Sequence, residues 1–167
     1  FISSTQIGFN YRLSDINSAL GLSQIKRTNI FINKRKKIAK FYDMKFLKLD
    51  KYIKNKKIDK STSSAFHLYL ILVDFEKLKI SRENFMKILL QNKIRTQVHY
   101  APIYKHLIFF DIKKKNLDGC NKYYEKCLSI PIFYDLKINQ ANKVFKTISK
   151  IINEQTKLFN INTSKRN

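Results

Sequence analysis

Residues 8–25 read GFNYRLSDINSALGLSQI, a run that places a dense polar motif directly before a helix. Ser14 or Asp15 can accept hydrogen bonds from the free amides of a first helical turn, so we expect the first helix to begin there. Asn10 and Arg12 lie just ahead of that helix N-terminus, and an amide and a guanidinium in this position suit an anion. Because the motif stands so close to the first residue, we also expect the native protein to continue upstream.

The next part of the chain predicts a long helix, a loop and a buried strand. Apolar residues recur at spacings near three and four from Ile16 to Leu47, which predicts a long helix interrupted near Thr28. Residues 50–64 are polar and lysine-rich without a stable period, and they predict a loop. Residues 65–74 are rich in aromatic and β-branched side chains and predict a strand.

A helix and a second strand are expected after this strand. Ser81 begins a capping pattern for a helix that ends near Asn92. Residues 94–100 alternate in the manner of a short strand that runs into a proline-constrained turn. A strand, a helix and a strand with a short return predict a compact α+β unit.

The C-terminal third of the chain predicts two more helices. Asp118 can cap a helix over residues 119–128, which must end before Pro131 because the residue preceding a proline is pushed out of the helical region. Asn139 can cap a last helix with a clear apolar stripe. Residues 159–167 are polar and are expected to fray.

Length and composition predict one small domain with a leading segment. The chain has 167 residues, 44% of them hydrophobic, so it can bury the core of one ordinary domain. We place a motif loop and a long linking helix at residues 1–48, a small α+β domain at 49–158 and a frayed tail at 159–167. The sequence contains no run of eighteen apolar residues, so we expect no membrane-spanning segment. Cys120 and Cys127 fit no zinc-binding spacing, so we predict no metal site.

The formal charge of +22 favours a nucleic-acid partner at first sight, because clustered cations release counterions from a phosphate backbone. Lysines occur almost everywhere in this chain, however, while arginine, whose planar fork suits nucleic acid, is rare. We therefore expect no nucleic-acid partner. A basic nucleic-acid-binding domain stays an alternative, as does a stand-alone dimerisation or regulatory module.

Four ordered blocks carry a resemblance to a known family. Residues 8–24, 65–69, 98–103 and 127–132 each resemble a motif of the pyridoxal-phosphate-dependent sugar aminotransferases of the DegT/DnrJ/StrS type. The match covers nearly the whole chain up to the last helix. Within that family the sequence of these blocks is most similar to that of enzymes that aminate a UDP-linked 4-keto sugar on the way to pseudaminic acid.

The resemblance implies an α/β protein with the fold of aspartate aminotransferase, fold type I among pyridoxal phosphate enzymes. Such enzymes are cytoplasmic homodimers with shared active sites, and they hold pyridoxal phosphate on a lysine of a large domain. This chain would then be the C-terminal α+β small domain with its linking helix. The Schiff-base lysine would lie upstream, so we assign no catalytic residue here and expect no transamination by this part alone. The implied substrates are a nucleotide-linked keto sugar and an amino donor, usually glutamate.

The same resemblance implies four binding residues. Asn10 would reach the cofactor phosphate of the other subunit, and Arg12 would support the same anionic site. The alternative is a plain helix entry, with Asn10 in a turn and Arg12 in a surface ion pair. His99 and Tyr100 would contribute to the nucleotide-sugar pocket, or would instead be hydrogen-bonded within the small domain. Tyr104 stands where many relatives have histidine, which leaves the identity of the sugar open.

The exposure of the first helix distinguishes part of an aminotransferase from a stand-alone module. If it packs on a large domain or on a second subunit, then Ile16, Leu20 and Leu22 should be exposed when this chain is seen alone. A stand-alone module would cover that face.

Overall fold

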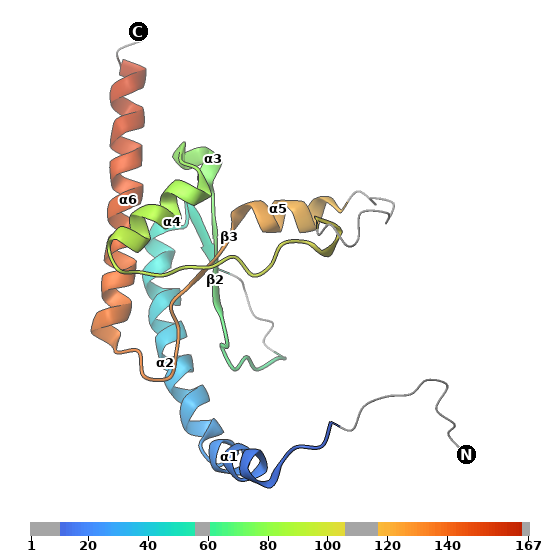
Figure 1. Cartoon of the computed structure of the whole chain (residues 1–167). Coiled ribbons are helices and arrows are strands. Elements are labelled where there is room, and N and C mark those ends of the chain that lie inside the picture. Colours follow the sequence, from blue (N-terminus) through green and yellow to red (C-terminus); the bar gives the residue numbers. More distant parts are fainter. Residues whose placement is uncertain (1–10, 56–60, 106–116, 165–167) are drawn as a thin grey trace.

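The computed structural model describes residues 11–55, 61–105 and 117–164. Side chains are described in these ranges as far as Leu158. Within these ranges the chain forms helices and short strands (Figure 1). In chain order the elements are α1 (Asp15–Ile25), α2 (Thr28–Phe46), the 3-10 turn η1 (Leu47–Leu49), β1 (Ile53–Asn55), β2 (Tyr69–Val73), α3 (Phe75–Leu78), α4 (Arg82–Gln91), the 3-10 turn η2 (Ile103–Lys105), α5 (Asp118–Lys126), β3 (Cys127–Ile130) and α6 (Ile138–Ser164).

The leading helices begin and break where the sequence predicts. The Ser14 hydroxyl caps α1 by accepting a hydrogen bond from the backbone amide of Asn17, at 3.4 Å. The chain then turns at residues 26–27, and α2 starts at Thr28. This break directs α2 toward the rest of the protein while α1 projects from it (Figure 1).

The sheet contains three antiparallel strands in the order β1-β2-β3. Ile53 of β1 pairs with Val73, and Ile71 at the centre of β2 pairs with Leu128 of β3. The strand predicted at residues 65–74 is confirmed as β2, although it is shorter than predicted. β1 lies inside the segment that the sequence predicts to be a loop, because three residues are too few to show an alternating pattern.

The core lies between the sheet and two long helices that run side by side, α2 and α6 (Figure 1). The Tyr42 ring of α2 lies 4.9 Å from that of Tyr69 in β2, and its hydroxyl donates to the carbonyl of Pro131 at 3.0 Å. Phe46 meets Phe145 of α6 edge to face, with ring centroids 5.6 Å apart. These contacts fix α2 to both the sheet and α6.

Three predictions for the second half of the chain are corrected by the structure. Residues 94–100 form no strand but only an isolated bridge between Gln97 and Ser129. The helix predicted to reach residue 128 ends at Lys126, because Cys127 already pairs with β2 as the first residue of β3. Where a frayed tail was expected from residue 159, the backbone stays helical to Ser164.

Two predicted caps also differ. Asp118 lies in the first turn of α5, and Leu117 takes the position before it. α6 begins at Ile138, so Asn139 lies inside the helix. The backbone amide of Lys137 donates to Oε1 of Gln140 at 2.9 Å. The predicted cap of α4 is confirmed, since the Ser81 hydroxyl accepts from the amide of Asn84 at 3.1 Å.

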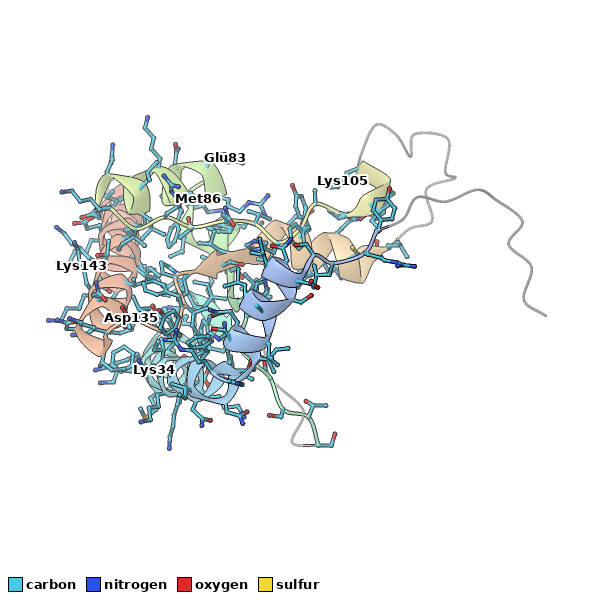
Figure 2. The ribbon with its side chains drawn as sticks, turned by 60° about the horizontal axis from the view of Figure 1, so that its bottom comes forward. Lys34, Glu83, Met86, Lys105, Asp135 and Lys143 are labelled. Atoms are coloured by element: carbon cyan, nitrogen blue, oxygen red, sulfur yellow. The ribbon has the colours of Figure 1, made fainter. Side chains whose placement is uncertain are left out.

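Positive charge is dense on α2, and further lysines lie on other elements. α2 carries Lys34, Arg35, Lys36, Lys37, Lys40 and Lys45. Figure 2 labels lysines of three different elements, Lys34 of α2, Lys105 of η2 and Lys143 of α6. Of the helices in the described ranges, none has the length and apolar character needed to cross a membrane.

Candidate functional site

The predicted ligand residue His99 is held by a buried serine. His99 is half-buried in the irregular segment between α4 and η2, and its Nδ1 lies 2.7 Å from Oγ of Ser129 in β3. Ser129 is only 5% exposed. The strand therefore fixes one ring nitrogen of the histidine.

Tyr100 is the outer member of the same pair. Its side chain is 73% exposed, and its ring meets the His99 ring edge to face with centroids 4.7 Å apart. His99 is thus engaged within the small domain, as the alternative reading of this residue expects, while Tyr100 faces outward. The two residues form a half-open polar surface at the edge of β3.

The turn that follows continues this surface. The hydroxyl of Tyr104 donates to Oδ1 of Asn121 in α5 at 2.5 Å, and the Lys105 ammonium lies 4.6 Å from the centre of the Tyr124 ring. Arg82 of α4 also donates to the Tyr124 carbonyl and lies over its ring. η2 and α4 are thereby tied to α5.

The N-terminal pair is only partly visible. Asn10 lies outside the described residues. Arg12 is exposed in the extended segment before α1, and no ion pair of Arg12 occurs among the residues that the structure describes. The surface ion pair that was the alternative for Arg12 is therefore not found there. The structure brings His99, Tyr100 and Ser129 together, and it records no contact between this group and Arg12.

A separate polar cluster joins α2 to the sheet. The buried Tyr69 hydroxyl donates to Oδ1 of Asp43 at 2.5 Å, and Nδ2 of Asn55 donates to the same oxygen at 3.4 Å. Burial, with the neighbouring carboxylate, raises the pKa of Tyr69 well above its ordinary value. The phenol therefore stays protonated and acts as the donor to Asp43.

A hollow of about 1080 Å³ lies beside this cluster. It is bounded by α2, by β1 and by the segment that leads into β2, and it contains Asp43, Asn55 and Tyr69 in its wall. Of the predicted binding residues that the structure describes, Arg12, His99 and Tyr100, none lies in its wall.

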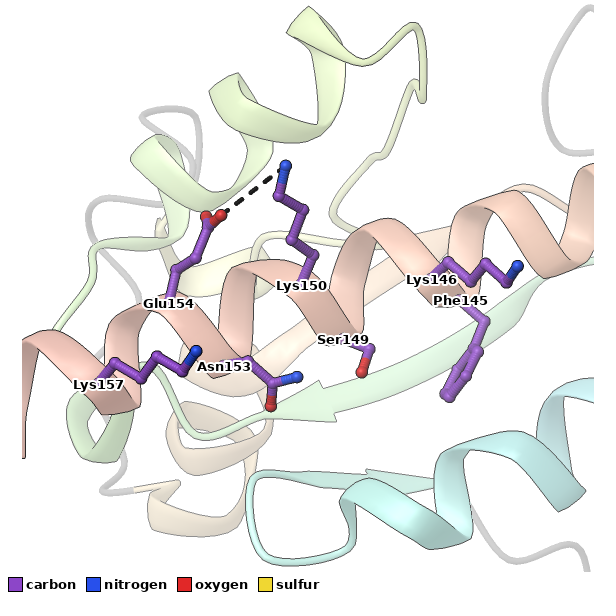
Figure 3. Close-up of a pocket in the computed structure, with 7 residues that line it drawn as sticks. All are labelled: Phe145, Lys146, Ser149, Lys150, Asn153, Glu154 and Lys157. Atoms are coloured by element: carbon purple, nitrogen blue, oxygen red, sulfur yellow. Dashed lines mark ion pairs between the residues drawn. The ribbon is translucent and has the colours of Figure 1, made fainter.

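A second hollow, of about 380 Å³, lies on α6 alone (Figure 3). An ion pair between Lys150 and Glu154, 3.8 Å apart, lies along one side of it. Because one helix supplies all of its lining, it is a furrow between side chains and not a candidate site. The described residues also hold no group of three or more His, Cys, Asp or Glu side chains that could bind a metal.

The sequence prediction missed one residue of this site, Ser129. All four residues of β3, CLSI, are buried, and serine is the only one with a strong hydrogen-bonding group. A buried hydroxyl needs a partner, so a serine inside an apolar strand is a signal that the sequence already contains. Its partner was not predictable, because His99 lies on a distant part of the chain.

Comparison with known proteins connects these residues to one family. Residues 1–149 match the DegT/DnrJ/EryC1/StrS aminotransferase family. The chain is 35% identical over 156 residues to the UDP-4-amino-4,6-dideoxy-N-acetyl-beta-L-altrosamine transaminase of Campylobacter jejuni, which covers 91% of this chain and 40% of that relative. It is 30% identical over 145 residues to the Helicobacter pylori protein of the same name, covering 86% of this chain and 38% of the relative. The chain thus spans about 40% of the length of the curated relatives it matches.

Solved structures agree in fold. Helicobacter pylori PseC, an aminotransferase involved in the biosynthesis of pseudoaminic acid, superposes with a TM-score of 0.79 at 29% identity, over 91% of this chain and 41% of PseC. The Streptococcus pneumoniae protein Spr1654 in its PLP form gives a TM-score of 0.75 at 22% identity, over 86% of this chain and 36% of that one. The predicted fold class, the α+β part of a fold type I protein, is confirmed.

Proposed function

We propose that this chain, which belongs to the DegT/DnrJ/EryC1/StrS aminotransferase family, is the C-terminal portion of a nucleotide-sugar aminotransferase. The proposed reaction transfers an amino group from glutamate to a keto sugar linked to a nucleotide, with pyridoxal phosphate as cofactor. The observation that carries this proposal is the family match over residues 1–149, together with 35% identity to a relative named for a UDP-linked amino sugar.

The exposed face of α1 supports a division of the chain into a linking segment at residues 1–48 and a small domain at 49–158. α1 has no buried residue. Ile16 is 83% exposed, Leu20 60% and Leu22 58%. Uncovered aliphatic side chains around a whole helix are typical of a helix that packs on other parts of a protein. In this proposal those parts belong to a large domain or to the second subunit of a homodimer.

Pyridoxal phosphate, when bound, supplies the electron sink for moving the amino group. The described residues do not enclose such a group, because Arg12 is exposed on a single extended segment. This chain would instead supply one wall of a shared site. Arg12 would offer its guanidinium to the phosphate together with the Asn10 amide, beside the amide groups at the start of α1.

His99 and Tyr100 would line the sugar-nucleotide side of the same active site. With Nδ1 of His99 engaged by Ser129, Nε2 is the ring nitrogen available to a ligand. Tyr100, largely exposed, can place both a ring face and a hydroxyl against the nucleotide. The nucleic-acid alternative receives no support from the family match, which covers residues 1–149.

A spectrum of the full-length protein tests the reaction class. We expect an absorbance of a pyridoxal phosphate Schiff base that shifts when glutamate is added, and an amino sugar as product from a UDP-linked 4-keto sugar. A protein without this absorbance after incubation with pyridoxal phosphate would refute the proposed function.

Two substitutions in the full-length protein then test the binding residues. Arg12→Ala should weaken pyridoxal phosphate binding about tenfold, the value of a charged hydrogen bond. Arg27→Ala is the matched control, because Arg27 is an exposed arginine of the same leading segment and its guanidinium stacks on Phe31.

His99→Ala should raise KM for the nucleotide sugar, and an unchanged KM would remove His99 from the pocket.

A further inference from the structure

We infer that Ser129 is a positioning residue, which holds the His99 ring in the orientation that receives the nucleotide sugar. This inference rests on the proposed role of His99 in the substrate pocket. It starts from one contact, the 2.7 Å separation of Ser129 Oγ and His99 Nδ1.

The backbone around this contact holds both residues in place. Ser129 pairs with Leu70 of β2 on one side. On its other side, its amide donates to the carbonyl of Gln97 at 2.8 Å, and the amide of Gln97 donates back at 3.2 Å. This bridge clips an otherwise irregular segment to the sheet edge two residues before His99. His99 is therefore anchored twice, by the backbone at Gln97 and by its own ring at Ser129.

The pairing also places His99 on the less covered face of the sheet. Residues directly opposite one another in an antiparallel pair lie on the same face, so Ser129 shares the face of Leu70. Tyr69 and Ile71, which alternate with Leu70, lie on the other face and belong to the core against α2 and α6. Leu70 is only half-buried, whereas Tyr69 and Ile71 are buried. A ring held against Ser129 on this face can meet a ligand without disturbing the core on the other face.

The chemistry of the pair decides which nitrogen the ligand meets. A serine hydroxyl can donate to an unprotonated Nδ1 or accept from a protonated one, and in both cases Nδ1 is occupied. Nε2 is then left for the substrate. Because the ring is already held in one orientation, substrate binding does not carry the entropic cost of ordering it. Removal of the hydroxyl would leave the ring free to rotate about its side-chain bonds.

The test compares Ser129→Ala with His99→Ala in the full-length enzyme. We expect Ser129→Ala to raise KM for the nucleotide sugar about two- to tenfold, the range of one neutral hydrogen bond, with kcat nearly unchanged. The double variant should show no further rise in KM beyond that of His99→Ala, since the serine is proposed to act only through the histidine. Nitrogen-15 NMR of His99 should show a changed Nδ1 signal in Ser129→Ala, which reports the loss of this contact, whereas the rise in KM and its absence in the double variant distinguish positioning from a purely structural role.

Thr96→Val is the matched control. Thr96, like Ser129, is a buried residue with a hydroxyl group, only 9% exposed, and it lies in the segment that carries His99. The substitution should leave KM and the Nδ1 signal of His99 unchanged. Ser129→Cys keeps the side chain small and retains a weak donor, so it serves if the alanine variant fails to fold, and it should raise KM less.

The outcomes separate this inference from the function on which it rests. If His99→Ala raises KM while Ser129→Ala does not, the positioning role is overturned and the substrate pocket stands. If the double variant has a higher KM for the nucleotide sugar than His99→Ala alone, Ser129 acts by another route and the inference is also overturned. If His99→Ala leaves KM unchanged, the pocket assignment itself fails.

Discussion

The substitution Tyr69→Phe tests the contact that joins the long helix α2 to the centre of the sheet. Tyr69 is 4% exposed, and its hydroxyl donates to Oδ1 of Asp43 on α2 at 2.5 Å. Phenylalanine keeps the ring in its place, 4.9 Å from that of Tyr42, and deletes only the donor. The measured effect is therefore that of one hydrogen bond to a carboxylate.

The structure limits the size of this effect. A hydrogen bond to a charged group contributes about 1.5–3 kcal/mol. Asp43 is exposed and keeps the hydrogen bond from Asn55, so water can replace the lost donor, and we expect a value at or slightly below the low end of this range, about 1–2 kcal/mol. Urea unfolding followed by circular dichroism would measure it as a lower midpoint. Tyr134→Phe is the control, because Tyr134 is 40% exposed and should change stability by less than about 0.5 kcal/mol. Equal midpoints for Tyr69→Phe and the unsubstituted chain would refute the reasoning.

The same tyrosine predicts a loss of stability in alkali. Burial, with the neighbouring Asp43 carboxylate, raises the pKa of Tyr69 in the folded state, whereas the unfolded chain releases this proton near pH 10. Above that pH the unfolded state binds fewer protons than the folded one, so stability falls as pH rises. Burial raises the pKa of Tyr42 as well, which adds to the slope. Tyr69→Phe should flatten the fall above pH 10, and an unchanged slope would contradict the assignment.

Two further substitutions test local structure. Ser81→Ala removes the cap of α4 and should cost about 1 kcal/mol in urea unfolding, whereas Ser149→Ala, inside α6, should be neutral or slightly stabilising; equal effects would contradict the capping role. The Lys126 ammonium, 3.0 Å from Asp74, and the Lys77 amide lower the pKa of Asp74, so the stability that this carboxylate contributes should be lost as pH falls below about 4. Asp74→Asn should abolish that part of the acid dependence, and an unaltered acid profile would exclude it.

The elements that the sequence predicted correctly are those with local causes. Ser14 and Ser81 cap α1 and α4 as predicted, since a cap depends on residues only three positions apart. The prediction missed β1 and was wrong in placing a strand at residues 94–100, because pairing depends on partners far along the chain. Ile53 belongs to a strand only since Val73 lies opposite it. Gln97 alone in the second segment finds a sheet partner, Ser129.

The candidate site divides along the same line. The motif around His99 and Tyr100 is readable because its residues are neighbours, whereas the serine that orients His99 lies thirty residues away, a separation that no local pattern records. A histidine that serves a ligand must present one defined nitrogen, and a residue on a 3-10 turn or a loop cannot ensure this by its own backbone. The sheet supplies that order through Ser129. The orientation of the ring is thus set by the strand, while its chemistry is set by the loop, so a substitution in β3 that leaves every predicted site residue intact should still change how the substrate is bound.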